Sequence, residues 1–263
     1  MFFHELNPIA FTIGPLEIRW YSLSYIFGIL ICWFIINKIL IKYKKKLNKQ
    51  VINDLINYLI VGIIIGGRLG YIIFYNLDFY IINPIEMLKI WNGGMSFHGG
   101  LIGIIISTFI FCKIKKHNFF DLTDLISLVT PIGIFFGRVA NFVNGELYGR
   151  ITESNFGIVF SKGGFLPRHP SQLYEAFFEG IILYLILNLL FFYTSLKFIR
   201  GIITGLFLFL YGFFRFFIEY FREPDEHIGL IFDYITMGQV LCLPMIIFGI
   251  ILIIHSLYKF KNG

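Results

Sequence analysis

Hydrophobic residues along this chain gather into long runs, and short polar stretches separate these runs. We expect membrane spans over residues 21–41, 55–75, 97–112, 122–142, 171–192, 202–221 and 234–257. Most of these runs approach 20 residues, the length at which an α-helix crosses a hydrocarbon core roughly 30 Å thick. The pattern predicts an all-α polytopic membrane protein of about seven transmembrane helices, a single integral membrane domain over residues 1–263.

The composition and the placement of lysine agree with this prediction. Hydrophobic residues make up 57% of the chain and charged residues only 14%, against roughly 25% charged residues in soluble domains. Lysines gather after the first, third and fifth predicted spans and near the C-terminus: Lys42, Lys44, Lys45, Lys46, Lys49, Lys113, Lys115, Lys116, Lys197, Lys259 and Lys261. Since cytoplasmic loops carry the excess of lysine, we expect a cytoplasmic C-terminus and an N-terminus outside. The net charge of +6 therefore reflects topology and does not indicate nucleic-acid binding.

The loops on the predicted outer side contain the polar chemistry. Residues 143–170 form the longest loop, with several glycines that include Gly149, and we expect them to build a small outer head. Most basic residues outside the lysine clusters are arginines, whose planar guanidinium suits carboxylate and phosphate groups. The three cysteines and six histidines show no metal-ligand spacing, so we expect no metal site.

Arg138 lies near the outer end of the fourth predicted span, where an unpaired arginine costs at least a few kcal/mol. Asn141 follows on the same helix face, and Glu146 comes within reach if the chain turns back. This set is a candidate ligand site. The alternative is an arginine that only extends its head group to the membrane interface.

The sixth predicted span carries a second polar set. Tyr211, Arg215, Glu219 and Arg222 step by four, four and three residues, which predicts one polar stripe on a phenylalanine-rich helix that Pro224 ends. We expect an ion pair between Arg215 and Glu219. That pair could hold a ligand, or it could only lock helix packing.

Three further groups are candidates on the outer side. His98 precedes Gly99 and Gly100, which allow close approach of a neighbouring helix or a ligand. Arg68 follows two glycines in the second span, and Tyr21 begins the first span, where an interfacial tyrosine is the alternative. Arginines, carboxylates and a histidine at one membrane face favour an anionic lipid head group as ligand. A secondary transporter for an anionic solute is the rival interpretation, although we find no internal repeat of the kind that such proteins show.

Six segments taken together resemble the prolipoprotein diacylglyceryl transferase family of bacteria, in order and over nearly the whole chain. They are residues 19–21 (RWY), 66–71 (GGRLGY), 93–103 (GGMSFHGGLIG), 137–146 (GRVANFVNGE), 168–175 (RHPSQLYE) and 215–225 (RFFIEYFREPD). One departure is Ala140, where the family usually has glycine.

The resemblance implies an enzyme of the bacterial inner membrane, with its N-terminus in the periplasm. It would transfer the diacylglyceryl group of phosphatidylglycerol to the lipobox cysteine of a prolipoprotein, form a thioether and release glycerol phosphate, without a cofactor. Arg138 and Arg215 become candidates for phosphate binding and leaving-group stabilisation, with Arg68, Asn141, Glu146 and Glu219 as further lipid-binding candidates. His98 or Tyr21 is the candidate base for the thiol, and Gly99, Gly100 and Gly149 have structural roles.

Overall fold

A computed structural model describes residues 2–43, 47–89, 93–224, 230–231 and 234–262. The chain divides into two compact units. Unit 1 comprises Met1–Ile36 and Asp124–Gly263, and unit 2 comprises Asn37–Thr123.

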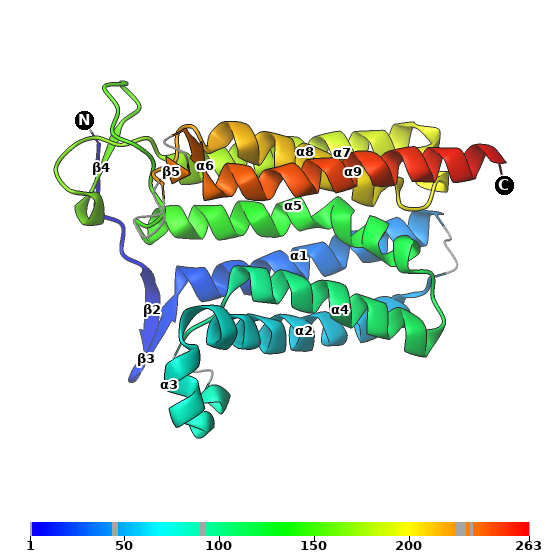
Figure 1. The fold of residues 1–263 in the computed structure, drawn as a ribbon, viewed down its shortest axis with the longest axis horizontal. Helices are drawn as coiled ribbons and strands as arrows, with labels where there is room; N and C mark the ends of the chain where they lie inside the picture. The colour runs from blue at the N-terminus through cyan, green and yellow to red at the C-terminus, as the bar shows by residue number, and fades with distance from the viewer. Residues whose placement is uncertain (1, 44–46, 90–92, 225–229, 232–233, 263) are drawn as a thin grey trace. The chain divides into compact units, whose positions relative to one another are not determined.

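Long helices make up most of unit 1 (Figure 1). They are the first part of α1 (Trp20–Tyr43), nearly all of α5 (Phe119–Val143), the continuous run of α6 (Ser171–Glu175), η4 (Ala176–Ile182) and α7 (Leu183–Tyr193), then α8 (Ile202–Ile218) and α9 (Met237–Asn262). Two short 3₁₀ turns, η3 (Ser161–Gly163) and η5 (Ser195–Phe198), lie in the connections. The segment η4 is π-helical, a form that is rare and is found mostly at functional sites.

Short strands pair in the loops of unit 1. Strand β1 (Phe2–His4) runs parallel to β4 (Ile158–Phe160), so the N-terminal residues join the long loop between α5 and α6. Strands β2 (Ile9–Ile13) and β3 (Leu16–Arg19) form an antiparallel hairpin immediately before α1, and β5 (Leu230–Ile231) pairs with β6 (Ile235–Thr236) before α9.

Unit 2 consists of α2 (Lys49–Tyr75), α3 (Leu77–Ile82), the 3₁₀ helix η1 (Pro84–Leu88) and α4 (Phe97–Lys115). Helices α2 and α4 pack through glycines at four-residue spacing. A Cβ atom built on Gly66 would lie 2.9 Å from the Cα of Gly103, and one on Gly70 would lie 2.7 Å from the Cα of Gly99. Small residues at this spacing let helix backbones approach closely within a membrane.

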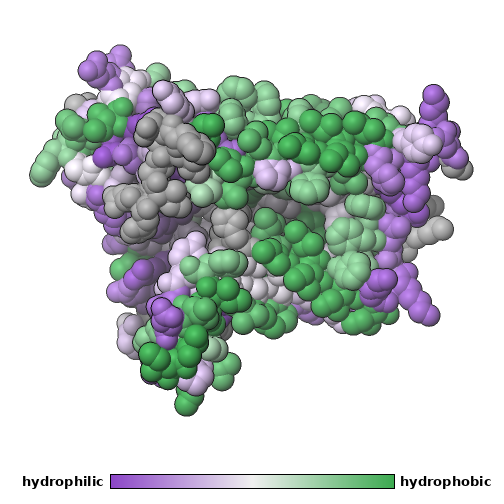
Figure 2. Space-filling view, in the orientation of Figure 1, coloured by the Kyte–Doolittle hydropathy of each residue, from purple (hydrophilic) through white to green (hydrophobic). Residues whose placement is uncertain are grey.

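The prediction of a helical, polytopic membrane protein is confirmed. Among the described residues, five helical runs are long and apolar enough to cross a bilayer: Trp20–Lys42, Lys49–Tyr75, Phe119–Val143, Ser171–Tyr193 and Met237–Asn262. Helix α8 is apolar but shorter, with 17 residues. Figure 2 shows apolar surface along α9 and hydrophilic side chains at its C-terminal end. Ile247, Phe248 and Ile254 are each more than half exposed there, as lipid-facing residues are.

Several helices begin or end at other residues than the predicted spans. Helix α2 begins at Lys49 instead of residue 55, because the Asn48 side chain caps it by accepting a hydrogen bond from the Val51 backbone N–H at 2.9 Å. Helix α8 ends at Ile218 instead of residue 221. Tighter turns follow this end, and Arg222 forms a β-bridge with Gly149. Arg222 therefore does not continue the helical stripe that its spacing predicted.

A buried carboxylate joins α5 to α8 at the end where α8 begins. Helix α8 starts at Gly201, which has no side chain to cap the helix. Asp124 from α5 takes this role and accepts hydrogen bonds from the Gly201 N–H at 2.7 Å and the Thr204 N–H at 2.8 Å. A negative group at a helix N-terminus also interacts favourably with the helix dipole.

We predict that Gly99→Ala destabilises the protein and that Gly100→Ala does not. A methyl group at Gly99 would collide with the backbone of Gly66, whereas one at Gly100 would lie 3.9 Å from Ile63, an ordinary contact. Overpacking of this kind costs about 1–3 kcal/mol. Thermal unfolding of both variants in the same detergent measures the difference, and equal transition temperatures would contradict the close packing of α2 on α4.

Candidate functional site

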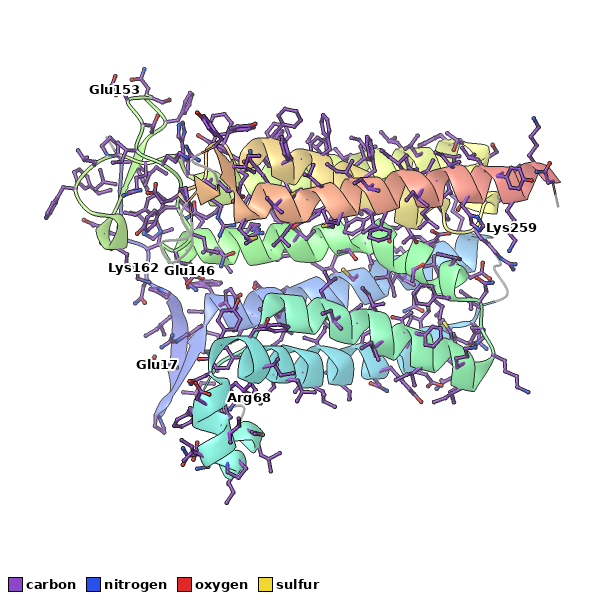
Figure 3. All side chains as sticks on the ribbon, viewed as in Figure 1. Glu17, Arg68, Glu146, Glu153, Lys162 and Lys259 are labelled. Carbon is purple, nitrogen blue, oxygen red and sulfur yellow. The ribbon has the colours of Figure 1, made fainter. Side chains whose placement is uncertain are left out.

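Ionisable side chains gather at one end of the unit 1 helices. Figure 3 labels Glu146, Glu153 and Lys162 at this end and Lys259 at the opposite end of the same unit. Three arginines and three glutamates of this end form a connected set of ion pairs: Arg138, Arg215, Arg222, Glu175, Glu179 and Glu219. We call this set the arginine–glutamate cluster.

Glu175 connects the three arginines of the cluster. Its side chain is fully buried at the end of α6. The carboxylate lies 2.9 Å from Arg138 Nε, accepts a hydrogen bond from Arg215 Nη1, and lies 3.8 Å from Arg222 Nη1. One carboxylate thus holds cations from α5, from α8 and from the segment after α8. Arg138 is paired inside the protein and is not an interfacial anchor.

Glu179 lies one helical turn beyond Glu175, inside the π-helical segment, and is also fully buried. Its oxygens are 3.7 Å from Arg215 Nη1 and 3.9 Å from Arg138 Nη2. These distances are ion-pair contacts but too long for hydrogen bonds. Neither oxygen has a hydrogen-bond partner among the described residues.

The ion pair predicted between Arg215 and Glu219 is confirmed, at 2.7 Å between Arg215 Nη2 and Glu219 Oε2. Arg215 therefore binds carboxylates on both sides of its guanidinium, with Glu175 on the other side. Gly238, in the first turn of α9, lies against Glu219, since a Cβ atom there would come within 2.9 Å of Oε2. This contact leaves the Glu219 carboxylate little room to turn away from Arg215.

The predicted contact between Asn141 and Glu146 is also confirmed. The chain turns after α5, and the Glu146 carboxylate accepts hydrogen bonds from Asn141 Nδ2 at 2.8 Å and Asn144 Nδ2 at 3.2 Å. The Glu146 backbone is held as well, because its carbonyl accepts a hydrogen bond from Gln172 Nε2 at 2.7 Å. Glu146 is therefore held through its side chain by two asparagines and through its backbone by Gln172.

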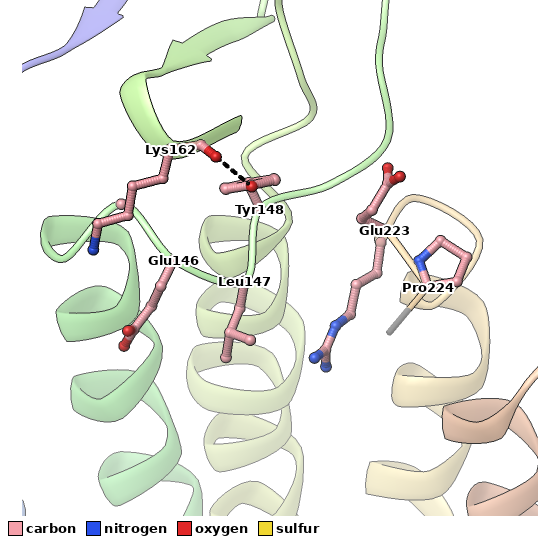
Figure 4. A pocket seen from close by; sticks show the side chains of 8 residues that line it. Glu146, Leu147, Tyr148, Lys162, Glu223 and Pro224 are labelled. Carbon is pink, nitrogen blue, oxygen red and sulfur yellow. Dashed lines mark hydrogen bonds between the residues drawn. The ribbon is translucent and has the colours of Figure 1, made fainter. Parts of the chain in front are cut away.

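A cavity of about 240 Å³ adjoins the cluster (Figure 4). Its walls are Gly145, Glu146, Leu147, Tyr148, Lys162, Arg222, Glu223 and Pro224. Arg222 belongs both to this wall and to the ion pairs around Glu175. Tyr148 and Lys162 close one side, where the Tyr148 hydroxyl donates to the Lys162 carbonyl at 2.9 Å. The cavity therefore joins the buried charges to the loop between α5 and α6.

Gly149 and Arg168 connect the loop between α5 and α6 to the segment that follows α8. A Cβ atom at Gly149 would lie 2.7 Å from the His169 carbonyl oxygen, so this position requires glycine. Arg168 donates to the Gly149 carbonyl at 3.2 Å and pairs with Glu223 at 2.9 Å. Burial lowers the pKa of His169 below its usual range, and its ring is therefore neutral at neutral pH. Its Nδ1 lies 3.2 Å from the Tyr174 hydroxyl.

Tyr21 lies in unit 1 at the start of α1, where its hydroxyl is 3.1 Å from the hydroxyl of Tyr25. Tyr25 in turn interacts electrostatically with Arg138 and Glu146. The two tyrosines thus extend the polar network of the cluster onto a further helix.

Arg68 and His98 belong to unit 2. Arg68 is buried, and among the described residues its guanidinium donates hydrogen bonds to the backbone carbonyls of Glu86, Met87, Lys89, Gly93 and Gly94. It therefore clamps the loop between α2 and α4. His98 lies in the first turn of α4, and its side chain falls outside the described residues.

The sequence reasoning missed Glu175 and Glu179 as members of the site. The available signal was two carboxylates four residues apart in an otherwise apolar run, because ionisable groups within a membrane span are costly and rarely lack a role.

Comparison with known proteins identifies the family. A model of the prolipoprotein diacylglyceryl transferase family matches residues 8–255. The chain is 54% identical to the phosphatidylglycerol–prolipoprotein diacylglyceryl transferase of Rickettsia akari (strain Hartford), over 97% of this chain and 99% of the relative. The enzyme of the same name from Rickettsia canadensis (strain McKiel) is also 54% identical, over 98% of this chain and 100% of the relative. The chain therefore belongs to the prolipoprotein diacylglyceryl transferase family.

Proposed function

We propose that this chain transfers the diacylglyceryl group of phosphatidylglycerol to the lipobox cysteine of prolipoproteins. The cysteine sulfur attacks the glycerol carbon that carries the phosphate ester, and a C–S bond forms as the C–O bond breaks. The thiol proton passes to a base, and glycerol phosphate leaves with the bonding electrons. The product is a thioether-linked lipid on the protein.

The observation that carries this proposal is the arginine–glutamate cluster at one end of apolar helices. Arginine binds phosphate through two parallel hydrogen bonds, and apolar helix walls suit acyl chains. Negative charge grows on the leaving phosphate oxygen as the C–O bond breaks. Cations held in position beforehand stabilise that charge without rearrangement, and Glu175 holds Arg138 and Arg215 in this way.

Arg138 and Arg215 are our candidates for binding the phosphate and stabilising the leaving group, with Arg222 as a third cation at the cavity wall. Asn141 and Glu146 would orient the glycerol head group, since Glu146 lines the cavity. Glu219 would hold Arg215. Arg68 has a structural role in this proposal, because its guanidinium already donates hydrogen bonds to backbone carbonyls.

His98 is the proposed base for the thiol, and Tyr21 is the second candidate. At neutral pH an imidazole with a pKa near 6.5 is unprotonated and can accept the proton of a thiol with a pKa near 8.5, whereas a phenol with a pKa near 10 still holds its own proton. This assignment rests on the family motif around His98.

For the arrangement in the membrane, we propose seven spans in the inner membrane, with α4 and α8 added to the five long runs. Residues 143–170 would form a periplasmic head on a single membrane domain that covers residues 1–263. The N-terminus would be periplasmic and the lysine-rich C-terminus cytoplasmic. The transporter interpretation has no support from the family to which the chain belongs.

We predict that Arg138→Lys weakens phosphatidylglycerol binding about ten- to a hundredfold, because lysine keeps the charge but loses the planar fork. Titration of each purified variant with phosphatidylglycerol measures binding. Mass spectrometry of a lipobox peptide incubated with enzyme and lipid measures the diacylglyceryl group gained by its cysteine. Arg200→Lys, at an exposed position near the start of α8, is the control. If both variants match the wild type, phosphate recognition belongs to Arg215 and Arg222.

The same mass assay tests the proposed activity itself. Absence of any mass gain with wild-type enzyme would refute it.

We predict that His98→Gln lowers turnover roughly a hundredfold or more, while lipid binding changes little, because a general base acts on the thiol and not on the lipid. With wild-type enzyme the rate should rise with pH through the titration of a histidine near 6.5 and then level off. Transfer by His98→Gln at the wild-type rate would instead assign the base to Tyr21.

We predict that single cysteines at the two ends of the bundle react from opposite sides of the membrane. Ser161→Cys, in the head, should react with an impermeant thiol reagent added to intact spheroplasts. Gln50→Cys, at the start of α2, should react only after lysis. Both positions are exposed, and Gln50 avoids the cap that Asn48 provides. Reaction of Gln50→Cys before lysis would reverse the proposed topology.

A further inference from the structure

Glu179 differs from the other carboxylates of the cluster in how it is bound. Glu175 accepts a hydrogen bond from Arg215 and lies 2.9 Å from Arg138 Nε, and Glu219 lies 2.7 Å from Arg215 Nη2. Glu179 is fully buried, its shortest ion pair is 3.7 Å, and neither oxygen accepts a hydrogen bond from a described residue. A buried carboxylate in this condition is costly when ionised and far less costly when protonated.

The protonation state of Glu179 sets the net charge of the cluster that the lipid phosphate meets. With all members ionised, three arginines meet three glutamates and the cluster is neutral. A phosphodiester with one negative charge would then enter a neutral, buried site. If one glutamate is protonated, the cluster carries one positive charge and the phosphate neutralises it, which favours binding in a medium of low dielectric.

We propose that Glu179 carries a proton when the lipid binds, and that this neutral acid leaves Arg138 and Arg215 with the positive charge that phosphate recognition needs. Glu179 is then a positioning and charge-setting residue that acts through the arginines. The inference rests on the proposed function for the identity of the lipid. The proton belongs on Glu179 because, of the three carboxylates, it lies farthest from its nearest arginine.

Groups on several elements face Glu179. They are Arg138 from α5, Glu175 on the same helical run, Tyr211 and Arg215 from α8, Arg222 after α8 and Cys242 from α9. The arginines and Glu175 hold one another charged through direct contacts. Glu179 is therefore the member of this group that we expect to exchange a proton as lipid arrives.

The test measures binding of a diether phosphatidylglycerol to the full-length protein in detergent as a function of pH, without peptide. Wild-type affinity should fall about tenfold as the pH rises and Glu179 loses its proton, a change of roughly 1.4 kcal/mol. Glu179→Gln, a neutral mimic of the protonated acid, should bind with the low-pH affinity at every pH. Glu179→Asp keeps a titratable acid and should restore the pH dependence.

Infrared spectroscopy gives a second measurement that does not depend on affinity. The lipid-bound wild type should show the carbonyl band of a protonated carboxylic acid, and Glu179→Gln should lack it; the diether lipid has no ester carbonyl to obscure this band. Glu175→Gln is the comparison, and it should weaken binding at every pH, because Glu175 holds the arginines directly.

Two results would overturn the proposal: uniformly weak binding by Glu179→Gln, as for Glu175→Gln, or an unchanged pH dependence in Glu179→Gln. Either result would leave the proposed transferase activity standing, because the peptide mass assay with wild-type enzyme tests that activity separately.

Discussion

The ion pairs of Glu175 are the interaction on which the rest of the site depends. A guanidinium buried among apolar helices is costly unless a carboxylate meets it, and removing one partner of such a pair costs several kcal/mol. Glu175 meets arginines from three segments at once. The fold thereby fixes α5, α6 and α8 relative to one another at this end of unit 1, and the arginines that bring them together are those proposed to bind phosphate.

Neighbouring residues restrict the movement of the other charged groups around Glu175. Asn141 and Asn144 fix the carboxylate of Glu146, and Gly238 confines that of Glu219. The tight contact at Gly149 brings the loop between α5 and α6 against the segment that carries Arg222. Fixed charges suit a reaction in which negative charge moves onto a leaving phosphate, because no reorganisation is then needed as the bond breaks.

The sequence predicted the helices well, because long apolar runs leave the chain few alternatives in a membrane. It predicted the pairs that are close in the chain, because helical spacing determines the pair of Arg215 with Glu219 and a turn after α5 brings Glu146 back to Asn141. It could not predict that Glu175 would bind Arg138 and Arg215, since that contact joins residues far apart in the chain. Nor could the spacing of residues alone show that Arg68 donates its hydrogen bonds to backbone carbonyls.

Glu175 and Glu179 share one set of arginines because positions four residues apart lie on the same helix face. The segment that follows Glu175 is π-helical and includes Glu179, so the helix departs from regular α-helical hydrogen bonding where both side chains enter the cluster. Glu175 holds the arginines through short contacts, and Glu179 meets two of the same arginines at longer distances. A structural carboxylate and an exchangeable one thus lie one turn apart on a single helical run.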